Sequence, residues 1–132
     1  MGYIDVLAAA LAAWLFGALW YSALSRPWMR AAGVPMTPEG KPIGNGSALP
    51  FLLSALAMVV VAGMMRHVFA LSAIDTILEG VTSGFGIGLF FITPWIAINN
   101  AYPGRPYRLT LIDGGYATLG CTLIGGVLTA LG

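Results

Sequence analysis

Four long stretches of this sequence contain no charged residue, and they constrain the fold more than any other feature. They cover residues 6–25, 42–65, 80–104 and 114–132. A helix needs about 20 mostly apolar residues to cross the hydrocarbon layer of a membrane, and each stretch is close to or above that length. Only 8% of the 132 residues are charged, against about 25% in ordinary soluble domains. The sequence therefore predicts a membrane protein.

These apolar stretches must be helical, because hydrocarbon offers no hydrogen-bond partner to backbone N–H and C=O groups. We therefore expect an all-α fold, a bundle of four transmembrane helices forming one integral membrane domain over residues 1–132. The expected spans are residues 3–24, 48–69, 76–98 and 108–131. A short polar turn at residues 72–75 joins the second and third spans, so these two should pack as a tight hairpin.

Proline and glycine residues predict the structure of the segments between the spans. Pro27 suits the first turn of a helix and Gly33 its end, so residues 27–32 predict a short helix at the membrane surface. Six Gly or Pro residues among residues 35–47 predict a flexible loop. Pro103 and Gly104 predict the corner of the turn before the fourth span.

Lys and Arg residues are distributed unequally between the two sides of the predicted bundle. Arg66 alone lies on the side of the termini, and the other five lie in the first and third loops: Arg26, Arg30, Lys41, Arg105 and Arg108. Cytoplasmic loops carry the excess of Lys and Arg in membrane proteins. We therefore expect loops 25–47 and 99–107 to face the cytoplasm and both termini to face outward.

Small residues recur at every fourth position in three of the spans, as they do where membrane helices approach closely. The rows are Gly80, Gly84 and Gly88 with GxxxG spacing, Ala9, Ala13 and Gly17, and Gly114, Thr118, Thr122 and Gly126. Such rows either pack the helices of one chain or join two copies as a homodimer, and both alternatives stay open.

Proline interrupts the third span near its end. Pro94 has no N–H to donate to the helix, so it should distort the helix there. A polar crevice is expected to open beside this distortion.

One carboxylate, Asp113, lies inside the fourth span. It is five residues from the expected start of the span, about 7.5 Å along the helix axis. At this shallow depth a carboxylate costs less than the roughly 2.5–3.5 kcal/mol that applies at the centre of a membrane. Hydrogen-bonding side chains from the ends of three spans should surround it: Tyr21, Asn99, Asn100, Arg105, Arg108 and Tyr116. Two interpretations of Asp113 stay open. In the structural one its hydrogen bonds hold the helices together, and in the functional one it titrates a proton or binds a ligand.

A second polar group is expected on the opposite side of the bundle. Asp75 and Glu79 are four residues apart on one helix face, and Arg66 lies near the end of the second span. We expect Arg66 to form a salt bridge with one of these acids. His67 beside them lacks the second nitrogen or sulfur ligand that zinc prefers, so no metal site is expected.

Two segments resemble a known family. The segments "GALWYSALSRPWMRAAGV" and "PWIAINNAYPGRPYRLTLIDGGYATLG" are similar to the first-span exit and to the third loop and fourth span of the domain-of-unknown-function family 1761. The resemblance implies a small bacterial protein of the inner membrane with four spans. It implies no particular reaction.

Three classes of function compete. A non-enzymatic membrane module, either an accessory subunit or a binder of lipid or a small apolar molecule, is favoured because the sequence has no nucleophile paired with a base. The alternative is a small homodimeric proton-coupled transporter that uses Asp113 or Glu79, and an intramembrane enzyme ranks third. The expected partners are the lipid bilayer and either a second copy or another membrane protein. Neither nucleic acid nor a cofactor is expected.

Overall fold

The computed structural model describes residues 3–40 and 48–132, and every regular element within them is a helix. Four helical stretches are long and apolar enough to cross a membrane: Ile4–Ala23, Leu49–Leu71, Ile77–Ala101 and Tyr107–Leu131. The predicted all-α, four-span fold class is therefore confirmed. Residues 41–47, which include Lys41 and part of the predicted flexible loop, lie outside the described residues.

Local sequence signals determine where several helices begin and end. α1 (Ile4–Ala23) leads directly into α2 (Ser25–Ala32), the predicted short helix of the first loop. α2 ends at Gly33, whose φ of 74° is left-handed and suits a residue without a Cβ. Thr76 caps α4 (Ile77–Gly86) through a capping box with Glu79. Gly104, with φ of 75°, forms the turn before α6 (Tyr107–Leu131).

The third span is a continuous run of helix built from three parts. α4 is followed by a π-helical segment, η1 (Ile87–Ile92), and then by α5 (Thr93–Ala101). Pro94 lacks an N–H, so the helix must change its hydrogen bonding near this residue. The wider π turn lies directly before it, and the hydroxyl of Thr93 donates to the carbonyl of Gly88 at 2.7 Å. The expected distortion at Pro94 thus takes the form of a π segment.

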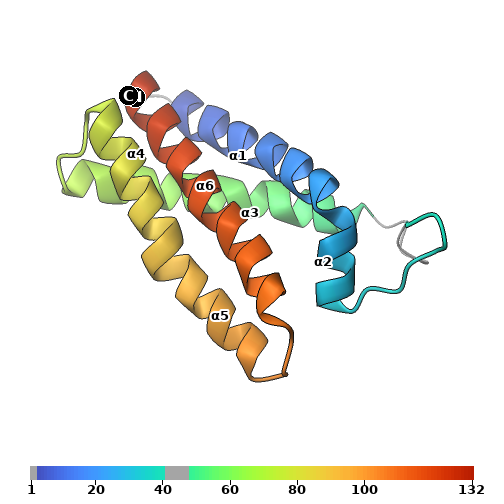
Figure 1. The fold of residues 1–132 in the computed structure, drawn as a ribbon. Coiled ribbons are helices and arrows are strands. Elements are labelled where there is room, and N and C mark those ends of the chain that lie inside the picture. The colour runs from blue at the N-terminus through green and yellow to red at the C-terminus, as the bar shows by residue number, and fades with distance from the viewer. Residues whose placement is uncertain (1–2, 41–47) are drawn as a thin grey trace.

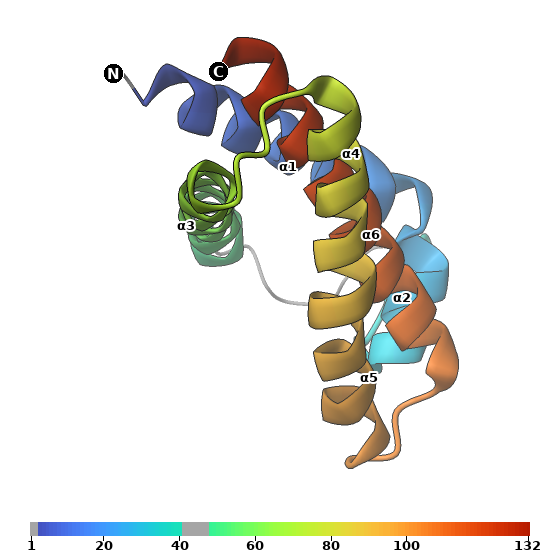
Figure 2. The ribbon, with the colours of Figure 1, turned by 90° about the vertical axis from the view of Figure 1, so that its left-hand side faces the viewer.

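α6 occupies the centre of the bundle (Figures 1 and 2). It packs against α1 on one side and against α4, η1 and α5 on the other, and α2 lies against its first half. The glycine row of the third span faces it. A Cβ added to Gly84 would collide with the carbonyl of Cys121, and one added to Gly80 would collide with the carbonyl of Gly125. These glycines therefore let two helix backbones of the same chain come into direct contact.

α3 (Leu49–Leu71) packs along α1, where Ala62, Met65 and Phe69 are buried in the core. α4 follows α3 after a turn at residues 72–76, yet it packs along α6 rather than along α3 (Figure 2). The predicted tight hairpin of the second and third spans was therefore wrong. The glycine face of α4 allows a closer approach to α6 than the Leu, Val and Met side chains of α3 would allow.

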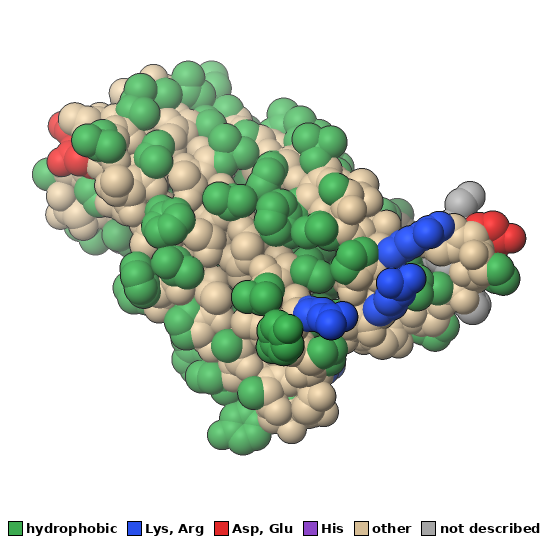
Figure 3. All heavy atoms as spheres, in the orientation of Figure 1, with side chains coloured by type: hydrophobic (Ala, Val, Ile, Leu, Met, Phe, Trp, Pro, Cys, Tyr) green, Lys and Arg blue, Asp and Glu red, His purple; other side chains and the backbone are tan. Residues whose placement is uncertain are grey.

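The surface of the molecule is apolar along all four spans. Figure 3 shows hydrophobic side chains spread over the helices, with arginine side chains gathered on the side that carries α2 and the start of α6. Such a continuous apolar surface would make a soluble protein aggregate, but it suits contact with lipid. α1 begins and α6 ends at the same end of the molecule, opposite the turn between α5 and α6 (Figure 1).

Candidate functional site

A polar cluster joins the end of α1 to the first half of α6. The hydroxyl of Tyr21 donates to Oδ1 of Asp113 at 2.7 Å, and both side chains are half-buried. Asp113 lies six residues after the first residue of α6, about 9 Å along the helix axis. The tyrosine hydroxyl satisfies the carboxylate without bringing a second charge into the membrane. Tyr21 and Asp113 thus form the centre of the α1–α6 polar cluster.

Aromatic rings enclose this hydrogen bond. The ring of Tyr21 meets the ring of Tyr116 edge-on, with 5.4 Å between centroids, and meets Trp28 of α2 at 5.9 Å. The cluster therefore brings together residues from α1, α2 and α6.

Two further aromatic side chains tie α1 to α6 through backbone carbonyls. Because Gly17 has no side chain, the hydroxyl of Tyr116 reaches the carbonyl of Ala13 and donates to it at 2.9 Å. The indole N–H of Trp20 donates to the carbonyl of Ile112, also at 2.9 Å. Tyr116 was expected as a donor to Asp113, but its hydroxyl is directed to the backbone of α1 instead.

The other predicted members of the cluster lie elsewhere. Asn100 is buried, where it donates to the hydroxyl of Thr110 at 3.2 Å and accepts from Arg105 at 3.4 Å. These two bonds hold the turn between α5 and α6. Asn99 and Arg108 are exposed. Of the donors expected for Asp113, Tyr21 makes the hydrogen bond, while Asn100 stabilises the neighbouring turn.

At the other end of the bundle, Arg66 pairs with Asp5. Nε of Arg66 lies 3.1 Å from Oδ2 of Asp5, and the guanidinium lies 5.4 Å from the centre of the Tyr3 ring. The predicted salt bridge to Asp75 or Glu79 was therefore wrong. The reason is the packing of α3 along α1, which brings Arg66 to the first turn of α1.

Asp75 lies in the turn that precedes α4, and Glu79 lies in the first turn of α4. The carboxylate of Glu79 accepts from the hydroxyl of Thr76 at 2.9 Å and from its N–H at 3.2 Å. Both acids are exposed. Over residues 3–40 and 48–132, no three His, Cys, Asp or Glu side chains lie close enough together to hold a metal ion.

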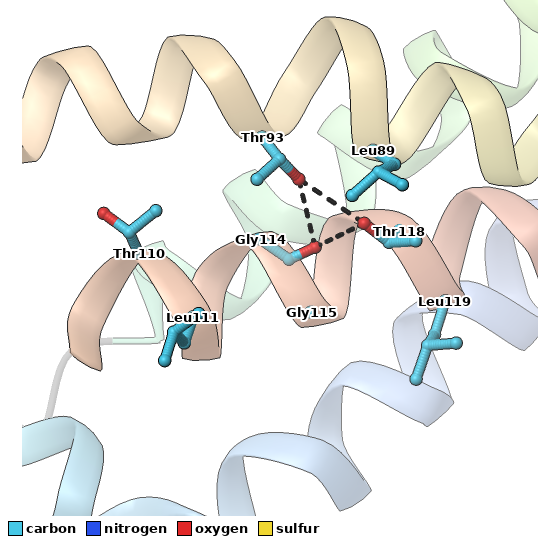
Figure 4. Close-up of a pocket in the computed structure, with 8 residues that line it drawn as sticks. All are labelled: Leu89, Thr93, Thr110, Leu111, Gly114, Gly115, Thr118 and Leu119. Carbon is cyan, nitrogen blue, oxygen red and sulfur yellow. Dashed lines mark hydrogen bonds between the residues drawn. The ribbon is translucent and has the colours of Figure 1, made fainter. Parts of the chain in front are cut away.

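A groove opens between η1 and α5 on one side and α6 on the other, and we call it the α5–α6 groove. Its volume is about 280 Å³. The residues that line it are Leu89, Thr93, Thr110, Leu111, Gly114, Gly115, Thr118 and Leu119. Figure 4 shows Leu89 and Thr93 pointing from the upper helix toward α6, where the two glycines lie between Leu111 and Leu119. A Cβ added to Gly114 would collide with Thr93, and one added to Gly115 would collide with Trp20 of α1, so both glycines let neighbouring side chains approach α6 closely.

The hydroxyl groups of the groove's threonines are bonded within the protein. Thr93 and Thr118 donate to helix carbonyls at 2.7 and 2.8 Å, and Thr110 accepts from Asn100 at 3.2 Å. The groove therefore presents little besides hydrocarbon. A polar crevice was expected beside Pro94, but the groove found there is apolar.

Comparison with known proteins places the chain in a family. A family model described as "Protein of unknown function (DUF1761)" matches residues 4–129, which includes all four spans and the polar cluster. No curated protein and no solved structure matches the chain. The protein therefore belongs to the DUF1761 family, whose members are of unknown function.

Proposed function

We propose that this protein is a non-enzymatic module of the bacterial inner membrane that binds a lipid or another small apolar molecule in the α5–α6 groove. The observation that carries the proposal is the apolar lining of the groove. An accessory role beside another membrane protein belongs to the same class and is compatible with such binding. The family membership supports a small membrane protein without naming an activity.

The chemistry of the groove favours an apolar ligand over a polar one. A polar molecule would lose its hydrogen bonds to water and would find the threonine hydroxyls already bonded within the protein. A hydrocarbon ligand has no hydrogen bonds to lose when it enters the groove. The groove's volume of about 280 Å³ also suits a slender ligand, because an apolar cavity of roughly 150 Å³ already binds benzene.

Native mass spectrometry of the protein released from lipid nanodiscs tests the proposal. Leu111→Trp should obstruct the groove, since Leu111 lines it and is exposed enough for the larger ring to fit. Leu15→Trp is the matched control, because Leu15 is also an exposed leucine of a spanning helix and does not line the groove.

We expect the unaltered protein and Leu15→Trp to retain a defined apolar adduct that Leu111→Trp loses. Equal retention by both tryptophan variants, or no adduct on the unaltered protein, would overturn the proposal. The same spectra give the oligomeric mass, which decides between monomer and homodimer.

A proton-coupled homodimeric transporter is the second candidate, and the half-buried Asp113 favours it. A carboxylate inside a membrane span is a common device for coupling transport to protons. Glu79, the other acid considered, is exposed and bonded within the capping box of α4, which leaves Asp113 as the coupling residue. In proteoliposomes with an internal pH dye, Asp113→Asn should abolish a proton flux while the fold is retained. Unchanged flux would remove this candidate.

A further inference from the structure

Taking the α5–α6 groove as the binding site of the proposed function, we infer that its ligand is an anionic phospholipid. One acyl chain lies in the groove, and Arg108 binds the phosphate of the headgroup. Three features of the structure support this ligand: the residues at the mouth of the groove, the positive charge at that end of the molecule, and the depth to which the groove runs.

The mouth of the groove carries an arginine and a tyrosine. Tyr107 and Arg108 begin α6; Tyr107 precedes the groove residues Thr110 and Leu111 by three and four positions, and Arg108 precedes Leu111 by three. Residues at this spacing lie on one face of a helix, one turn apart. Tyr107 is 72% exposed and Arg108 is exposed too. Arg108 makes no hydrogen bond or ion pair with any residue that the structure describes, so its five N–H donors have no partner there.

Positive charge gathers at the same end of the molecule as the mouth. α2 packs against α6, and its exposed Arg26 and Arg30 are four residues apart on one face of that helix. Arg105 lies in the turn just before α6. Figure 3 shows arginine side chains gathered on one side of the molecule. A guanidinium binds a phosphate through two parallel hydrogen bonds, and each basic residue near a membrane surface attracts anionic lipid by about 1 kcal/mol.

The groove runs to the depth of one leaflet. Its residues on α6 extend from Thr110 to Leu119, nine residues later, which is about 13.5 Å along the axis. Half of a hydrocarbon core of about 30 Å is about 15 Å. An acyl chain that hangs from a headgroup at Arg108 would follow the groove over this length. A helix of a second copy would instead cross both leaflets, and the groove stops after one.

The test uses nanodiscs that contain equal amounts of phosphatidylglycerol and phosphatidylcholine with identical acyl chains, read by native mass spectrometry. The protein should retain phosphatidylglycerol in preference to phosphatidylcholine. Arg108→Gln should lower this preference about fivefold, the factor that corresponds to about 1 kcal/mol. Arg30→Gln removes the same charge from α2, away from the groove face of α6, and should change the preference less than twofold.

Other outcomes of the experiment would overturn either the lipid assignment or the proposed function. Equal retention of the two lipids, with loss of both in Leu111→Trp, overturns the assignment of the headgroup and leaves the proposed function intact. No retained lipid in any variant overturns the proposed function itself. Excess soluble glycerol phosphate should not displace the retained lipid, because it has no acyl chain. Displacement would show that Arg108 recognises a free phosphate and would overturn the lipid assignment.

Discussion

Single side chains connect the helices of this protein by completing each other's hydrogen bonds. Tyr21 donates to the carboxylate of Asp113, and Tyr116 and Trp20 donate to helix carbonyls across the same interface. Inside a membrane an unpaired polar group has no water with which to form a hydrogen bond, so each such bond specifies which helix faces must meet. Over the described residues, no buried side-chain nitrogen or oxygen is left without a partner.

The hydrogen bond between Tyr21 and Asp113 should contribute measurably to stability. Tyr21→Phe leaves a half-buried carboxylate without its donor, so we expect the free energy of unfolding to fall by about 1–2 kcal/mol. The measurement is unfolding in mild detergent, followed by circular dichroism. Tyr102→Phe is the matched control, since Tyr102 is 90% exposed and its loss of a hydroxyl should change little. Identical unfolding curves for the two variants would contradict the assignment.

Helix pairing in this bundle follows the small residues. α4 and η1 place Gly80, Gly84 and Gly88 against the backbone of α6, and on α1 the residues Ala9, Ala13 and Gly17 are all buried. Backbones that approach this closely gain van der Waals contact, which is the main attraction between helices in lipid. α3 carries larger side chains, and few of its residues are buried.

Comparing Gly84 with Gly86, both in α4, distinguishes how close helix packing affects stability from how the backbone flexibility of glycine affects it. A Cβ at Gly84 would meet the carbonyl of Cys121, so Gly84→Ala should push α4 from α6 and destabilise the protein by about 1–3 kcal/mol. A Cβ at Gly86 meets nothing within 4 Å. Gly86→Ala should therefore stabilise the helix by about 0.5–1 kcal/mol. Unfolding in detergent measures both, and equal destabilisation by the two changes would disprove the role of close packing.

Exposed arginines are distributed unequally between the two ends of the molecule. The N-terminal end of α1 and the C-terminal end of α6 lie together at one end of the bundle, and the α5–α6 turn lies at the other end (Figure 1). The exposed arginines Arg26, Arg30, Arg105 and Arg108 lie in the first loop and beside that turn. This distribution is the basis of the predicted orientation, with the arginine-rich loops in the cytoplasm.

Labelling of single cysteines tests this orientation. In a Cys121→Ala background, Ser72→Cys marks the turn between α3 and α4, and Glu39→Cys marks the first loop. A maleimide that cannot cross membranes, applied to intact spheroplasts, should label Ser72→Cys and spare Glu39→Cys until the membrane is permeabilised. The opposite pattern would reverse the orientation, and equal labelling of both sites would show that the chain inserts both ways.

The sequence by itself determined the number of spans, their helical nature and the short helix after the first span. These are local properties, because hydrocarbon obliges each uncharged stretch to satisfy its own backbone, and residues such as Gly33 and Thr76 end or begin helices through their immediate neighbours. The pairing of Tyr21 with Asp113 could be expected from the same layout, since helix ends on one side of a membrane lie at one depth, but the other polar residues expected there bond elsewhere or are exposed.

Only the tertiary structure decided which helix faces meet. It put α3 against α1 and α4 against α6, which gave Arg66 the partner Asp5, directed Tyr116 to the backbone of α1, and opened the α5–α6 groove. The physical reason is that several helices carry rows of small residues, and each row is compatible with more than one partner. The pairing is set by the fit of all the faces together, and no single stretch of the sequence contains that information.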